Sequence, residues 1–74
     1  MKKIFKRVQK IYPEAYDCSN ADRIKIEVTN NMYIKEFPAG IYRLGTLDEE
    51  ICRSTDISEI VGVVRAIKKC NIAG

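Results

Sequence analysis

The chain has 74 residues, of which 46% are hydrophobic, and its 13 basic and 10 acidic residues give a formal net charge of +3. This length predicts a single small domain over residues 1–74, and the hydrophobic fraction excludes an intrinsically disordered chain. The chain has no histidine, which excludes Ser-His and Cys-His nucleophiles and zinc sites with mixed histidine and cysteine ligands.

Residues 2–12 have the pattern of an amphipathic helix that ends at Pro13. Apolar side chains recur at helical spacing on one side, and the basic residues fall on the opposite side. Two interpretations stay open: the helix covers the core and its basic side is only solvated, or it binds the phosphates of nucleic acid or a membrane surface. The nucleic-acid contacts would be Lys2, Lys3, Lys6, Arg7 and Lys10.

Residues 14–22 are predicted to form a loop. Asp17, Asn20 and Asp22 supply oxygen atoms, but their spacing departs from that of an EF-hand and no glutamate closes the set. The sequence therefore predicts no metal site, and local side-chain turns are expected here instead.

Residues 23–44 carry the clearest strand signature in the chain. Apolar and polar residues alternate over residues 23–29 and again over residues 32–35, which predicts two strands joined by a turn. Residues 38–40, Pro-Ala-Gly, predict a second turn, and residues 41–44 a third short strand. Together these segments predict a small three-stranded antiparallel sheet.

The register of the first two strands follows from their apolar faces. A two-residue loop at residues 30–31 would set Lys35 opposite Ile26 on the apolar face. A three-residue loop at residues 29–31 keeps Lys35 outside, and exposing apolar side chains costs more (~1.5–3 kcal/mol each) than an exposed lysine pair (~0.2–1 kcal/mol). The predicted pairs are therefore Ile26–Ile34, Val28–Met32 and Lys25–Lys35.

Residues 46–49, Thr-Leu-Asp-Glu, have the form of a capping box. They predict a short helix from Leu47 to Arg53 that buries Leu47 and Ile51. Together with a following helix over residues 57–70, it would suggest a helix-turn-helix, but the pattern fits poorly: no glycine lies in the turn, and Gly62 occupies a position that needs a buried aliphatic side chain. The same region is acidic, since Asp and Glu far outnumber Arg between residues 46 and 59.

Residues 57–70 predict a second long helix, which begins after a cap-like Asp56 and carries basic residues in its last turns. Ile57, Ile60, Val61, Val64 and Ile67 are expected to face the sheet. Val63, Ala66 and Cys70 widen the apolar arc well beyond the ~100° that a surface helix needs. This helix is either buried on two sides within one chain or offers a second face to a partner, and Gly62 would let another backbone approach that face.

The three cysteines, Cys18, Cys52 and Cys70, are odd in number and widely spaced, and the sequence shows no secretory signal. They are expected to be free thiols in a cytoplasmic protein. No apolar run approaches the ~18 residues that a transmembrane helix needs.

These elements predict an α+β fold of order α-β-β-β-α-α, in which the first and last helices flank a three-stranded sheet. The chain is predicted not to be an enzyme and to need no cofactor. The leading hypothesis is a partner-binding or regulatory protein, of the inhibitor or adaptor kind that phages and other mobile elements encode. It would act through Gly62, Val63, Ala66 and Cys70, on a protein partner or as a homodimer. The alternative is a small nucleic-acid-binding protein that uses the basic N-terminal helix.

Overall fold

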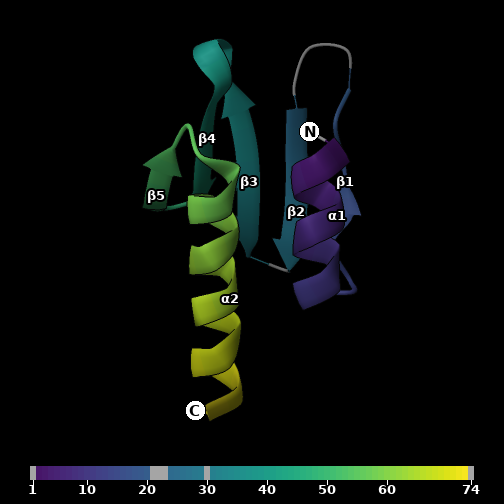
Figure 1. Cartoon of the computed structure of the whole chain (residues 1–74), viewed down its shortest axis with the longest axis vertical. Coiled ribbons are helices and arrows are strands. Elements are labelled where there is room, and N and C mark those ends of the chain that lie inside the picture. The colour runs from purple at the N-terminus through teal and green to yellow at the C-terminus, as the bar shows by residue number, and fades with distance from the viewer. Residues whose placement is uncertain (1, 21–23, 30, 74) are drawn as a thin grey trace.

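Five strands and two helices make up the part of the chain that the computed structural model describes, residues 2–20, 24–29 and 31–73 (Figure 1). A single 3-10 turn at Pro38–Gly40 separates the third and fourth strands. In chain order the elements are α1 (Lys2–Ile11), β1 (Tyr16–Asp17), β2 (Ile24–Thr29), β3 (Met32–Phe37), β4 (Ile41–Gly45), β5 (Glu50–Ser54) and α2 (Ile57–Ala73).

The strands form one antiparallel sheet in the order β1-β2-β3-β4-β5, so every strand pairs with its neighbours in sequence. Both helices lie on one face of this sheet, side by side and running in the same direction (Figure 1). α1 packs over β2, and α2 packs over β4 and β5. The class is therefore α+β, with the helices in a layer of their own. Neither helix has the length and apolar character needed to cross a bilayer within the described residues.

The hydrophobic core lies between the two helices and the sheet. Because side chains alternate along a strand, one face of each central strand supplies apolar residues to this layer. Each helix contributes apolar residues, repeated at helical spacing, to the same layer. The fully buried members are Ile4, Val8, Ile26, Val28, Ile34, Leu44, Ile60, Val61 and Val64.

The pairing of β2 with β3 confirms two of the three predicted pairs and corrects the third. Ile26 pairs with Ile34 and Lys25 with Lys35, as predicted. The Val28–Met32 pair is wrong, because Met32 pairs with Thr29 and Val28 is the extra residue of a β-bulge. The bulge keeps both Val28 and Met32 in the core while shortening the turn. The conformation of Asn30 in that turn lies outside the described residues.

The predicted helix from Leu47 to Arg53 is wrong, because this region forms a hairpin that ends in β5. Thr46 does act as a cap: its Oγ1 accepts hydrogen bonds from the backbone N–H groups of Asp48 (3.2 Å) and Glu49 (3.1 Å). The backbone N–H of Thr46, however, donates to the carbonyl of Glu49 at 2.9 Å, which closes a turn. Leu47 and Ile51, which a helix would have buried, are 77% and 40% exposed.

The predicted three-stranded sheet is also wrong, since β1 and β5 extend it to five strands. β1 lies in the predicted loop and pairs Tyr16 with Glu27 and Asp17 with Ile26. A two-residue strand is too short to leave an alternating pattern in the sequence. Because residues 47–53 are not helical, the helix-turn-helix alternative is excluded as well.

Candidate nucleic-acid interface

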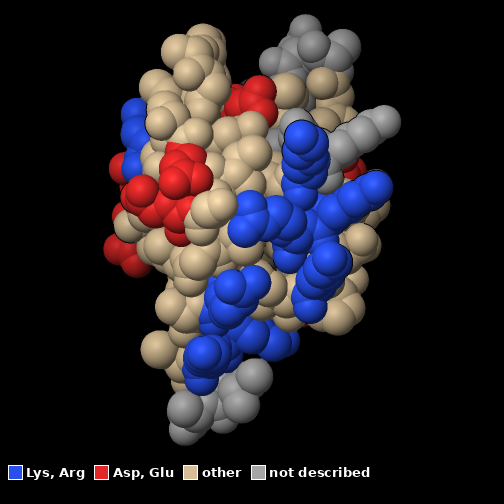
Figure 2. Space-filling view, in the orientation of Figure 1, with Lys and Arg blue, Asp and Glu red and all other residues tan. Residues whose placement is uncertain are grey.

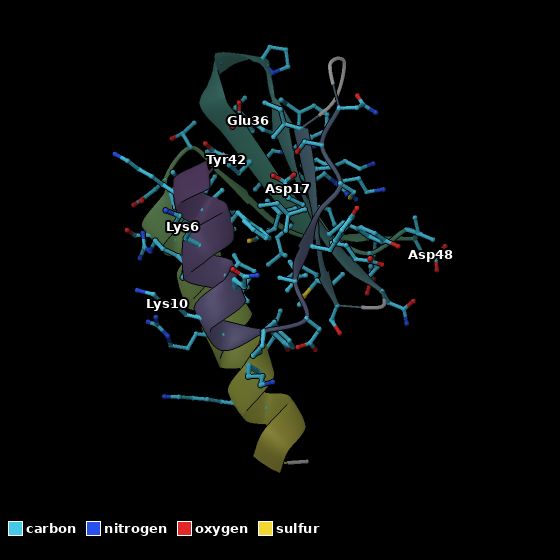
Figure 3. The ribbon with its side chains drawn as sticks, turned by 90° about the vertical axis from the view of Figure 1, so that its right-hand side faces the viewer. Lys6, Lys10, Asp17, Glu36, Tyr42 and Asp48 are labelled. Carbon is cyan, nitrogen blue, oxygen red and sulfur yellow. The ribbon has the colours of Figure 1, made fainter. Side chains whose placement is uncertain are left out.

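α1 presents a basic outer side. Ile4 and Val8 anchor the helix in the core, which turns Lys3, Lys6 and Lys10 outward, and these three lysines are exposed. Figure 3, turned by 90° from Figure 1, shows Lys6 and Lys10 on the side of α1 that faces away from the sheet. The helix contains no acidic residue that could neutralise them. Lys2 belongs to α1, but its side chain lies outside the described residues.

α2 continues this basic side. Arg65 and Lys69 are exposed, and the Nζ atom of Lys68 lies 4.5 Å from the centroid of the Tyr12 ring at the end of α1. Figure 2 shows the basic side chains gathered over α1 and the second half of α2, with the acidic side chains mostly toward β5 and the start of α2. We define the basic helical surface as Lys3, Lys6, Arg7, Lys10, Arg65, Lys68 and Lys69.

A hydrogen bond from Arg7 joins the two helices. The Nη1 atom of Arg7 donates this hydrogen bond, of 3.2 Å, to Oγ of Ser58, in the first turn of α2. Within the described residues, the ion pairs are confined to Glu50 with Arg43 and Arg53 in the sheet. The cations of the basic helical surface therefore have no described carboxylate to pair with and are available to an external anion.

A surface hollow of about 240 Å³ lies within this basic side and is lined by Lys6, Gln9 and Lys10. Each lining side chain carries hydrogen-bond donors, and the two lysines add positive charge. The lysine ammonium groups place positive charge around this hollow, while its lining surface consists mostly of the apolar parts of these side chains. No group of three or more His, Cys, Asp or Glu side chains that could hold a metal occurs among the described residues.

The residues predicted to bind a protein partner lie on the exposed flank of α2, with one exception. Gly62, Ala66 and Cys70 are exposed and follow one another at four-residue spacing, so they lie along one line of the helix. Val63 is half-buried and packs against the core. The flank is therefore made mainly of small side chains.

Burial raises the pKa of one thiol and one phenol, those of Cys52 and Tyr42. Burial, with lesser contributions from Glu59 and Glu50, raises the pKa of Cys52 above its ordinary value, which keeps the thiol protonated. The Sγ of Cys18 donates a hydrogen bond of 3.5 Å to the carbonyl of Lys25. Burial likewise raises the pKa of Tyr42, assisted by its hydrogen bond with Glu36 on β3 (Figure 3).

Three members of the basic helical surface were missed by sequence reasoning. From the sequence alone, these residues predict only a favourable interaction of positive charge with the C-terminal end of a helix; they are Arg65, Lys68 and Lys69. A signal was present, since no acidic residue follows Glu59. These residues lie beside the lysines of α1 because the two helices pack together. The residue pattern within each helix does not predict that packing.

Comparisons of the chain with protein-family models, with curated proteins and with solved structures found no match.

Proposed function

We propose that the chain binds nucleic acid through the basic helical surface, by contacts to the phosphate backbone. One observation supports the proposal: four basic side chains of α1 and three of α2 lie on one side of the molecule. None of these seven forms an ion pair among the described residues. Phosphates attract such a surface electrostatically, and backbone contacts of this kind carry no sequence information of their own.

A duplex is the form of nucleic acid that this surface suits. Stacking unpaired bases needs exposed aromatic rings. The large hydrophobic side chains that the described structure exposes are Tyr16, Phe37, Leu47 and Ile51, and none of them belongs to α1 or α2. The same observation disfavours insertion of α1 into a membrane, which would require exposed apolar groups beside the lysines.

The test uses two double charge reversals that change the net charge equally. Lys6→Glu with Lys10→Glu removes two cations that have no described partner, whereas Arg7 is avoided because it bonds to Ser58. Lys25→Glu with Lys35→Glu is the control for duplex binding only, because these half-buried lysines lie on β2 and β3, on the sheet face opposite the helices.

Binding is measured by fluorescence anisotropy with a labelled DNA duplex at several salt concentrations. The wild type should lose affinity with a log–log slope of about −0.9 per phosphate contact. The α1 variant should lose duplex binding and the control should keep it, with unchanged circular dichroism for both. Equal loss in both variants, or wild-type binding to anionic vesicles but not to duplex, would contradict the proposal.

A second proposal concerns the exposed flank of α2. Gly62 favours it, since a Cβ atom at this position would meet no atom within 4 Å, so that another backbone has room to approach. A protein partner or a second copy of the chain would pack its own helix along Gly62, Ala66 and Cys70, with Val63 at the edge of the contact. This is the partner-binding or regulatory role predicted above.

A further inference from the structure

The face of the sheet opposite the helices has no described element over it. Figure 3 shows α1 and α2 on one side of the strands and only side chains on the other. The strand register lines up four basic residues across this open face: Lys25 pairs with Lys35, Lys35 with Arg43, and Arg43 with Arg53. Neighbouring strands lie about 4.8 Å apart, so this cationic row crosses four strands over about 14 Å.

Aromatic rings flank the cationic row on both sides. Tyr33 and Phe37 lie two residues before and after Lys35 in β3, so all three side chains share the open face. Tyr16 of β1 lies on the same side of the row as Tyr33, because both residues pair with Glu27. Tyr16 is 62% exposed and Phe37 is 39% exposed. The open face therefore places three aromatic rings beside the cationic row, together with two carboxylates: Glu27, between Tyr16 and Tyr33, and Glu50, beside Arg43 and Arg53.

The two halves of the cationic row differ in how their charge is balanced. Glu50 bonds to Arg43 at 3.2 Å and to Arg53 at 2.8 Å, so one carboxylate balances one of the two positive charges in the β4–β5 half. Lys25 and Lys35 lie directly opposite each other and have no ion pair among the described residues. Like charges in this position repel each other, and an anion placed between the two lysines would relieve that repulsion.

Two of the rings, Tyr33 and Phe37, each have a long cationic side chain lying over them. The Nζ atom of Lys25 lies 4.2 Å from the centroid of the Tyr33 ring, and Cζ of Arg53 lies 5.6 Å from that of Phe37. A nucleic-acid base stacked on an aromatic ring is generally held more strongly than an exposed cation–π contact. A base can therefore displace either cation, which then becomes free to contact a phosphate.

We infer that the open face of the sheet binds single-stranded nucleic acid, with bases stacked on Tyr16, Tyr33 and Phe37 and a phosphate held between Lys25 and Lys35. Only unpaired bases expose the faces that stacking needs, so a duplex does not fit this surface. A protein partner fits it less well, since protein interfaces have cores depleted in charge. The site is separate from the basic helical surface and does not depend on it.

The experiment must separate this face from the basic helical surface, which also attracts any polyanion. The background is therefore the Lys6→Glu, Lys10→Glu protein, titrated with labelled single-stranded DNA and RNA of mixed sequence and with the duplex. Single-stranded binding should persist in this background. Adding Tyr16→Ser and Phe37→Ser should weaken it by at least about tenfold, because each ring supports one base. Both rings are exposed, so their loss leaves the core intact.

Tyrosine emission supplies a second readout, because the chain has no tryptophan to mask it. A base stacked on Tyr33 or Tyr16 should quench part of this emission in the Lys6→Glu, Lys10→Glu background, and Lys25→Glu with Lys35→Glu should remove the quenching. DNA and RNA that bind equally would indicate stacking and phosphate contacts alone, whereas stronger RNA binding would add a contact to the 2′-hydroxyl; either result supports the site. The inference is overturned if the aromatic variant keeps full single-stranded affinity, or if no single strand binds in this background.

Discussion

Gly45 ends β4 at a point where the chain leaves no room for a side chain. A Cβ atom built there would lie 2.6 Å from the carbonyl oxygen of Glu49 and 3.1 Å from Nη1 of Arg43. The first of these atoms belongs to the backbone and cannot move aside as the end of a flexible side chain can. The close approach of the two backbones in this hairpin therefore requires glycine.

We expect Gly45→Ala to destabilise the protein by about 1–3 kcal/mol, because the added methyl group must push the Glu49 peptide away. Gly62→Ala is the matched control. Nothing lies within 4 Å of its new methyl group, and alanine in a helix interior is more stable than glycine by ~0.5–1 kcal/mol. The urea concentration at the midpoint of unfolding should therefore fall for Gly45→Ala and rise for Gly62→Ala, relative to the wild type. Equal stability of Gly45→Ala and the wild type would show that the turn adopts another path.

β5 is an edge strand that pairs only with β4 within the described sheet. On the open face Glu50 adds to this attachment through its ion pair with Arg43 of β4, whereas its ion pair with Arg53 lies within β5 itself. These arginines, Arg53 first, lower the pKa of the Glu50 carboxyl below its ordinary value of 4.5. The hairpin therefore gains an attachment whose strength depends on pH.

We expect β5 to loosen in acid before the rest of the fold. Because the pKa of Glu50 is lower in the folded state, the stabilisation is fully present above its unfolded pKa and is lost as the pH falls through the folded value. Protection factors for the amides of β5 should fall relative to those of α2 between about pH 6 and about pH 3. Glu50→Gln should remove most of this relative change. If the Gln variant shows the same pH dependence, other carboxylates hold the strand.

The molecule as a whole separates its charges. The basic helical surface lies over α1 and the second half of α2, whereas the acidic side chains of Figure 2 gather toward β5 and the first turns of α2. The modest net charge of +3 hides this separation. The separation orients the molecule toward a polyanion, since the acidic end is repelled while the basic side is attracted.

Two substitutions in α2 separate a protein contact from ordinary core packing. Val64 is fully buried, so Val64→Glu should unfold the chain by placing an unpaired carboxylate in the core. Ala66 is exposed, so Ala66→Glu should preserve the circular dichroism spectrum yet prevent any association through the flank. Val63→Glu is a less clean probe, because Val63 is half-buried. Size-exclusion chromatography with light scattering gives the oligomeric state, and a wild type that stays monomeric at high concentration would rule out the homodimer.

Sequence alone determined the elements whose signals are local and repeated. α2 keeps helical spacing over several turns, and the central hairpin alternates strictly enough to set Ile26 opposite Ile34. A slip of one residue there would turn every apolar side chain to the solvent, so burial selects one register. The cations of α1 were visible for the same reason, since their side follows from the opposite apolar side.

Tertiary structure alone decided β1, β5 and the composition of both proposed nucleic-acid surfaces. The Thr46 hydroxyl can accept hydrogen bonds from backbone N–H groups either at the start of a helix or in a turn. Here the turn forms because the residues after it pair with the free edge of β4 as a strand. Likewise, Arg65, Lys68 and Lys69 join the cations of α1 because two helices pack side by side. The row from Lys25 to Arg53 exists because three strand pairings act together. Such contacts depend on segments far apart in the chain, and no local pattern encodes them.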